Sequence, residues 1–260
     1  MKGFPTRLCA AILIAAAPAL LGVASQHPAS IGAGQALQQL LDGNSRYVEG
    51  NARRPNQTTE RRTEVAGGQH PFAAILACSD SRVAPEIVFD QGLGDLFVVR
   101  LAGNVADPVV IESLDYAAKH LGTRLIVVMG HDRCGAVTAA VQGHEEPGDV
   151  DAMLAELRPA VEASKGKPGD PVDNAVRANV ELTVAKLKKS KPLSAMVEGR
   201  ELEIVGAVYH LDTGKVELLG ERPPPMIGRA ASGSPADALP GSCVIRAGAV
   251  YSRLAGCGDS

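Results

Sequence analysis

Two cysteines and one histidine in this chain have a spacing that suits a metal ion. His131 and Cys134 are three residues apart, and Cys78 lies 53 residues before His131. Two thiolates and one imidazole form a ligand set that Zn²⁺ favours. Three protein ligands leave a fourth position for water, as in catalytic zinc sites, whereas structural sites have four protein ligands. The spacing therefore predicts one catalytic Zn²⁺ per subunit.

A charged pair follows the first of these cysteines. In Cys78-Ser-Asp80-Ser-Arg82 the carboxylate and the guanidinium come directly after an apolar run, where unpaired charges are costly to bury. Arg82 would hold Asp80 ionised, and Asp80 could orient a water molecule on the metal. We therefore predict that Asp80 and Arg82 are catalytic. The alternative for Asp80 is a helix N-cap, because a helix is expected to follow Ser81.

Two other interpretations of the same residues stay open at this point. Cys78 and Cys134 could be ordinary buried cysteines, with a nearby histidine that binds nothing. They could also belong to an exported metal-binding or thiol-redox module, in which they cycle between dithiol and disulfide. The redox module predicts a dithiol without bound metal, and it leaves Asp80 and Arg82 unexplained.

Alternating strands and helices are predicted around these residues. Apolar runs predict buried strands, and apolar residues at helical spacing predict helices. The predicted strands are 72–77, 95–100 and 124–129, and the predicted helices are 36–48, 108–121, a segment from near Arg133, 150–164 and 172–189. Residues 203–219 predict a hairpin around Asp212-Thr-Gly214. The predicted fold class is α/β, with a mainly parallel central sheet flanked by helices and an antiparallel C-terminal edge hairpin. Such sheets bind ligands beyond the carboxyl ends of their strands, where Cys78 and His131 are expected.

The two ends of the chain differ in composition from its middle. Lys2 and Arg7 precede an apolar run over residues 8–23, and the small residues Ala24 and Ser25 follow. This pattern predicts a signal peptide over residues 1–25, the alternative being an uncleaved membrane anchor. Residues 26–221 are the predicted catalytic domain, and the Pro-, Gly- and Ser-rich residues 222–260 a flexible tail. The mature protein is therefore expected in the periplasm or outside the cell, without membrane contact.

Charge and cysteine content narrow the possible partners. The net charge is -3 at pH 7 and 45% of the 260 residues are hydrophobic, which argues for a globular domain and against a nucleic-acid-binding protein. Cys9 would leave with the signal peptide. Cys243 and Cys257 could pair with each other in the tail, which would leave the predicted metal thiolates free.

Four short motifs resemble those of the β-class carbonic anhydrases. They are Cys78-Ser-Asp-Ser-Arg82, Phe97-Val-Val-Arg100, Ala102-Gly-Asn104 and Gly130-His-Asp-Arg-Cys-Gly135, within a resemblance that runs from about Gln35 to Leu219. The resemblance implies reversible hydration of CO₂ to bicarbonate and a proton by a zinc-bound hydroxide. It implies Cys78, His131 and Cys134 as the zinc ligands, with Asp80 and Arg82 as the catalytic pair.

The same resemblance implies further features of the site. Phe97 would line an apolar CO₂ pocket and the Gly135 N–H would face the substrate, the alternatives being core packing and a tight turn. The enzyme would be a homodimer or homotetramer, with its site at the dimer interface closed by an N-terminal helix of the partner. In part of this family the aspartate instead ligates zinc and its arginine is released. A regulatory bicarbonate pocket built on Trp is excluded, because the chain has no Trp.

Two questions stay open in the sequence. A hydrolase of CS₂ or COS on the same scaffold is a rival enzyme. The proton relay is not identified among the surface histidines, which include His70, His120, His144 and His210.

Overall fold

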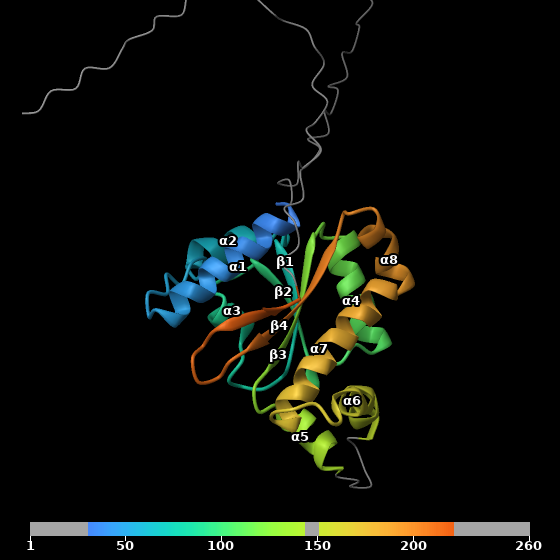
Figure 1. The fold of residues 1–260 in the computed structure, drawn as a ribbon. Helices are drawn as coiled ribbons and strands as arrows, with labels where there is room; N and C mark the ends of the chain where they lie inside the picture. Colours follow the sequence, from blue (N-terminus) through green and yellow to red (C-terminus); the bar gives the residue numbers. More distant parts are fainter. Residues whose placement is uncertain (1–30, 144–150, 221–260) are drawn as a thin grey trace, which may run out of the picture. The chain divides into compact units, whose positions relative to one another are not determined.

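Five strands form one sheet in the part of the chain that the computed structural model describes, residues 31–143 and 151–220 (Figure 1). The strands are β1 (Ala73–Ala77), β2 (Leu96–Arg100), β3 (Leu125–His131), β4 (Glu203–Tyr209) and β5 (Val216–Leu219), in the order β2-β1-β3-β4-β5. The first four strands are parallel, and β5 pairs antiparallel with β4 at the edge. The predicted α/β fold class is confirmed.

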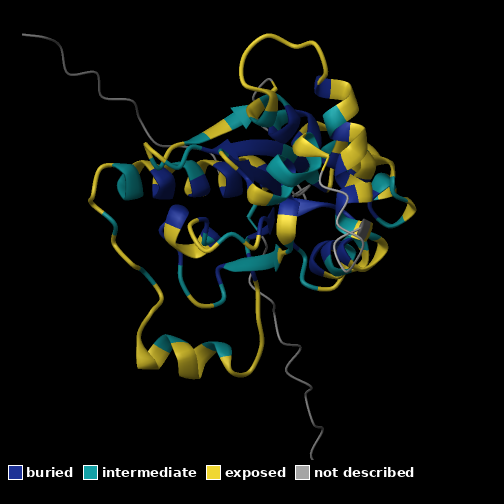
Figure 2. Ribbon diagram, turned by 90° about the horizontal axis from the view of Figure 1, so that it is seen from below, coloured by how far each residue is buried: buried dark blue, intermediate teal, exposed yellow. Residues whose placement is uncertain are grey.

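Helices cover both faces of this sheet. They are α1 (Ala33–Val48), α2 (Thr59–Val65), α3 (Pro85–Val88), α4 (Pro108–Lys119), α5 (Gly135–Gln142), α6 (Asp151–Ser164), α7 (Pro171–Lys189) and α8 (Lys191–Glu198). Figure 1 shows α1 and α3 on one side of the sheet, and α4 and α8 on the other, with α7 running along the sheet toward α5. The exposed outer faces and the buried strands are separated by colour in Figure 2.

The central strands are buried on both faces, as expected for parallel strands between helices. In β1, Ile75 packs into the core beneath α1, whereas Leu76 packs into the core beneath α4 and α8. In β3, Val127 packs into the same core as Ile75 and Val128 into the same core as Leu76, because successive side chains point to opposite faces. This double burial explains why the strands appear in the sequence as continuous apolar runs.

The strand order places one crevice at a defined position. β1 lies between β2 and β3, so the chain leaves β1 toward one side and crosses back to the other. In such sheets the ligand site lies where the order reverses, beyond the carboxyl ends of the strands. Cys78 follows β1 directly. His131 was predicted just past a strand ending at Met129, but β3 extends two residues further, so His131 is its last residue, in register with Tyr209 of β4.

Two glycines let α7 approach the sheet closely. A Cβ at Gly130 of β3 would lie 2.8 Å from Val180 Cγ2, and one at Gly206 of β4 would lie 2.7 Å from Val180 Cγ1. Real Cβ atoms do not approach other heavy atoms so closely, so these positions require glycine for the observed packing. The buried face of α7 is therefore held against the strands that lead to the site.

The N-terminal helix α1 packs on its own chain. Leu37 and Leu40 are buried in the core, and the Asn44 amide donates to the main-chain oxygens of Val88 and Gly214. One face of α1 is therefore buried against its own chain, and closure of the site by an N-terminal helix of the partner stays a prediction. Among the described residues no helix is long and apolar enough to span a membrane. The predicted signal peptide and the tail with Cys243 and Cys257 lie outside the described residues.

Four short elements were not predicted with bounds: α2, α3, α8 and the 3₁₀ turn η1 (Ala102–Asn104). α3 has a single turn, too short to show helical periodicity, and its N-cap Ala84 has no capping side chain. α8 begins directly after α7, with Ser190 between the two helices and Pro192 in the first turn of α8. The predicted end of α4 at Leu121 is two residues too late, since Lys119 ends it and His120 caps it.

Candidate metal centre

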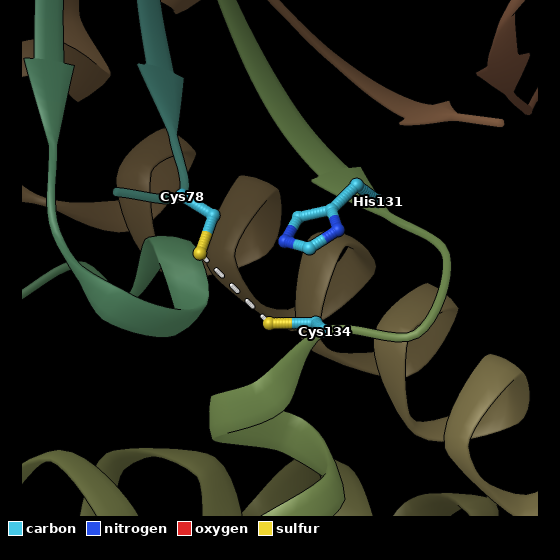
Figure 3. Close-up of side chains that lie close together, drawn as sticks. All are labelled: Cys78, His131 and Cys134. Carbon is cyan, nitrogen blue, oxygen red and sulfur yellow. Dashed lines mark hydrogen bonds between the residues drawn. The ribbon is translucent and has the colours of Figure 1, made fainter. Parts of the chain in front are cut away.

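Cys78, His131 and Cys134 meet at the crevice beyond β1 and β3 (Figure 3). Their three possible ligand atoms all lie within 4.8 Å of one another, and all three residues are buried. Cys78 comes from the loop after β1, His131 from the end of β3 and Cys134 from the N-cap position of α5. The structure thus brings the three predicted ligands together.

One ring nitrogen of His131 has a hydrogen-bond partner, and the other has none among the described residues. Its Nδ1 lies 2.9 Å from the main-chain oxygen of Asp132, and a carbonyl only accepts, so Nδ1 carries the proton. Nε2 is therefore a lone-pair donor, and it is buried with no hydrogen-bond partner among the described residues. Leaving a buried polar nitrogen unpaired is costly. A metal ion on His131 Nε2 would remove this cost, so the site fits Zn²⁺.

The two thiols also fit a cation. Their sulfurs are 3.9 Å apart, well beyond the length of about 2.05 Å of a disulfide bond. The hydrogen bond from Cys134 lowers the pKa of the Cys78 thiol, and the same pairing together with burial raises the pKa of Cys134. Two adjacent thiolates repel each other, so both can be deprotonated together only when a positive ion lies between them.

Asp80 and Arg82 form a two-pronged ion pair at the rim of the site. The Arg82 Nε donates to Asp80 Oδ1 at 2.9 Å, and a terminal nitrogen donates to Oδ2 at 2.7 Å. These bonds hold the pKa of the Asp80 carboxyl far below its usual range. Asp80 Oδ2 also lies 3.8 Å from His131 Nε2. Asp80 is therefore an ionised acceptor beside the metal position, paired with its arginine and not released from it.

The alternative that Asp80 is a helix N-cap is wrong. Its Oδ1 accepts from the main-chain N–H of Arg82 within a turn, and the N-cap of the next helix is Ala84. The Asp80 carboxylate therefore accepts from the main chain and the side chain of Arg82 and does not cap a helix.

Arg100 contacts this loop, although sequence reasoning gave it no role. Its Nε donates to the main-chain oxygen of Cys78 at 2.9 Å and a terminal nitrogen donates to that of Asp80 at 2.6 Å. The Arg100 side chain at the end of β2 therefore holds the loop that carries the proposed ligand Cys78 and the acceptor Asp80. A charged residue ending an apolar strand next to the site was the available signal.

A second contact missed by sequence reasoning reaches the Cys78 sulfur. The main-chain N–H of Gly103 donates to Cys78 Sγ at 3.4 Å, and the buried Asn179 of α7 donates to the Gly103 oxygen at 2.8 Å. No local pattern marks this contact, because Asn179 is 76 positions from Gly103.

The two predicted substrate residues lie differently. Phe97 of β2 is in register with Ala74, four residues before Cys78, so it lies on the order of 13 Å before that ligand at about 3.3 Å per residue. Its ring lies 6.3 Å from that of Tyr116. One chain therefore does not bring Phe97 to the ligands. Gly135 begins α5 beside Cys134, and a Cβ there would meet nothing within 4 Å, so the space where a side chain would lie is open.

Comparison with known proteins agrees with this geometry. Residues 73–216, more than half of the chain, match the family described as "Carbonic anhydrase". Carbonic anhydrase 2 of Mycobacterium tuberculosis is 43% identical over 188 residues, which cover 70% of this chain and 91% of the relative. The Coccomyxa β-carbonic anhydrase, solved with acetazolamide, superposes with a TM-score of 0.58 at 30% identity, over 70% of this chain and 86% of that one.

The chain belongs to the β-class carbonic anhydrases. A tetrameric β-carbonic anhydrase of Sordaria macrospora is a further structural neighbour, with a TM-score of 0.57 and 25% identity over 72% of this chain and 98% of that one. As a β-carbonic anhydrase, the enzyme catalyses the reversible hydration of CO₂ to bicarbonate. This activity replaces the alternatives of an exported redox or metal-binding module and a CS₂ or COS hydrolase.

Proposed function

We propose that this β-carbonic anhydrase hydrates CO₂ with one Zn²⁺ held by Cys78, His131 and Cys134, and with Asp80 and Arg82 as its catalytic pair. The observation that carries the proposal is the buried, unpartnered His131 Nε2 facing two thiols within 4.8 Å. When bound, zinc supplies the Lewis acidity that makes a nucleophile from water at neutral pH.

Asp80 sets the direction of the reacting water in this proposal. Because Arg82 keeps it ionised, Asp80 only accepts hydrogen bonds. A water molecule that donates to Asp80 has its O–H fixed on the carboxylate and its oxygen lone pair free for the carbon of CO₂. Arg100 holds the main chain of Asp80 in place. The space where a side chain at Gly135 would lie is open, and in this proposal the Gly135 N–H faces the substrate.

The variant Asp80→Asn tests the role of the carboxylate. The amide also donates and carries no charge, so we expect the rate of CO₂ hydration to fall about 100-fold, as for loss of a positioned proton acceptor, with zinc content unchanged. Asp212→Asn is the matched control, because Asp212 forms a similar two-pronged pair with Arg133 at the surface. Wild-type activity in Asp80→Asn would refute the proposed role.

The proposal includes a second copy of the chain against β2. This strand is an open edge of the sheet, and exposed apolar side chains flank it in the chain: Ile87 (63% exposed), Val109 (69%) and Tyr116 (46%). Open edges and exposed apolar side chains favour association. Because Phe97 lies on this edge and away from its own metal ligands, it can line a CO₂ pocket only in the site of a partner. A homodimer, alone or paired into a tetramer, supplies that partner.

We also propose that the enzyme is exported from the cytoplasm. The basic start, short apolar run and small residues up to Ser25 support a signal peptide, which places the mature enzyme in the periplasm or outside the cell. N-terminal sequencing of the enzyme from the cell envelope or medium of a bacterial host tests this. A mature chain that begins after Ser25 is expected, and an intact Met1 on a cytoplasmic protein would refute it.

A further inference from the structure

A main-chain N–H is aimed at one of the proposed zinc ligands. Gly103 donates to Cys78 Sγ at 3.4 Å, within the range for a hydrogen bond to sulfur. Gly103 adopts φ 74° in the turn η1, a region that residues with a Cβ enter only at a cost. A Cβ there would also lie 3.1 Å from Leu157 Cδ1. Backbone conformation therefore favours glycine at this position, and Leu157 leaves little room for a side chain.

The orientation of Gly103 is maintained from the far side by α7. Asn179 is buried, and its Nδ2 donates to the Gly103 oxygen at 2.8 Å. A buried amide is costly unless it is paired, so this bond strongly favours one position for Gly103. Because Gly130 and Gly206 let α7 lie close to the sheet, Asn179 can reach the turn that follows β2.

A hydrogen bond to a thiolate changes how much electron density the sulfur donates to a metal ion. A zinc ion with two thiolates and one neutral imidazole is formally neutral, so its Lewis acidity is modest compared with that of an all-histidine site. A donor on sulfur withdraws electron density from it and orients the ligand. The Cys78 sulfur has this donor, and the Asn179 amide donates to the main-chain oxygen of the same glycine.

We propose that Asn179 is a positioning residue of the zinc site, which holds Gly103 so that its N–H donates to the Cys78 thiolate and tunes the electron donation of this ligand. The inference rests on the proposed function, because it requires a metal on Cys78. A purely structural Asn179 would tie α7 to η1 and contribute to stability, without altering the spectroscopic properties of the metal site.

Nuclear magnetic resonance of the wild-type enzyme tests the contact without any mutation. With cadmium-113 in place of zinc, the amide proton of Gly103 should show a scalar coupling to the metal, transmitted through the N–H···S hydrogen bond and the sulfur–metal bond. A cadmium-loaded enzyme with no such coupling at Gly103 would overturn the inference while leaving the proposed function intact. An enzyme that binds neither cadmium nor zinc would overturn both.

The variants Asn179→Ala and Asn179→Asp test the role of the side chain. Both lose the amide donor, and the second keeps its shape. We expect transfer of zinc to a chelator to accelerate about tenfold, as for loss of other contacts behind metal ligands. In the cobalt-substituted enzyme the thiolate-to-metal absorption band should move to longer wavelength, because a sulfur without its hydrogen bond gives up electrons more readily.

Thr183→Val is the matched control, since Thr183 is buried one turn further along the same helix. It removes a buried hydroxyl from α7 and leaves Asn179 and the proposed ligands unchanged, so zinc release and the cobalt band should stay as in the wild type. Wild-type values in folded Asn179 variants, or equal changes in Thr183→Val, would overturn the inference.

Discussion

Arg100 donates a hydrogen bond of 2.6 Å to the main-chain oxygen of Asp80, 20 positions earlier in the chain. Arg100 ends β2, and Asp80 lies in the loop after β1, so the bond crosses from one strand end to its neighbour. The same guanidinium also holds the oxygen of Cys78. The conformation of the ligand loop is therefore set by a residue from outside the loop.

Arg100→Ala should consequently lower catalysis more than it lowers metal binding. Without the guanidinium, the loop that carries Asp80 loses two hydrogen bonds, and we expect kcat to fall at least about tenfold through misplacement of the carboxylate. Zinc content and CO₂ hydration, measured on the same samples, check this. Arg124→Ala is the control, because Arg124 pairs with Glu201 away from the site. Equal kcat in Arg100→Ala and wild type would contradict the positioning role.

The close packing of α7 on the sheet gives a prediction for stability. In Gly206→Ala the new Cβ would lie 2.7 Å from Val180 Cγ1, and such overpacking costs about 1–3 kcal/mol of unfolding free energy. Urea unfolding measures the change. Gly67→Ala, where a Cβ meets nothing within 4 Å, should stay within about 0.5 kcal/mol of wild type. Equal stabilities of the two variants would show that α7 can move away without cost.

Glu217 gives a prediction for pH dependence. Two hydrogen bonds from Arg177 lower the pKa of Glu217 to about 2. A lowered pKa stabilises the folded state above the unfolded pKa near 4.5, and this contribution is lost as the pH falls toward 2. Because the Glu217 side chain is 44% exposed, the contribution is about 1 kcal/mol or less.

Glu217→Gln should therefore be less stable than the wild type at pH 7, and the difference should shrink between pH 4.5 and pH 2, the window set by these two values. Urea unfolding of both proteins across this range provides the measurement. A difference that stays constant with pH would contradict the assigned cause.

The proposed dimer face gives a prediction for assembly. Val109→Asp places a charge on a side chain that is 69% exposed in one chain, so the isolated subunit should fold normally. Against a partner, the buried charge should weaken association and lower activity, since the site needs the partner's pocket. Sedimentation equilibrium should show dimers or tetramers for the wild type and monomers for the variant. An unchanged assembly would place the interface elsewhere.

Local features of this protein could be predicted from its sequence. The strand before Cys78 is a continuous apolar run because β1 is buried on both faces, and Asp80 pairs with Arg82 because they share one turn. The ligand set followed from residue types and spacing. The parallel sheet also followed, since alternating strands and helices have few other arrangements.

Contacts between distant segments could not be predicted in this way. Asn179 lies on the buried face of a helix, where its sequence neighbours do not show which carbonyl it meets. Arg100 has two acceptors only because β2 lies beside β1. Phe97 was given a role at the metal site that one chain does not provide, because the register of β2 places it near the start of the strand.

The most direct test of the account measures zinc and CO₂ hydration on one preparation of the purified enzyme before chelation, after removal of the metal and after its return. We expect about one zinc per chain, activity that falls in proportion to the zinc removed, and recovery when zinc is restored. Full activity in the metal-free enzyme, or a preparation in which Cys78 and Cys134 are joined as a disulfide and no metal binds, would contradict it.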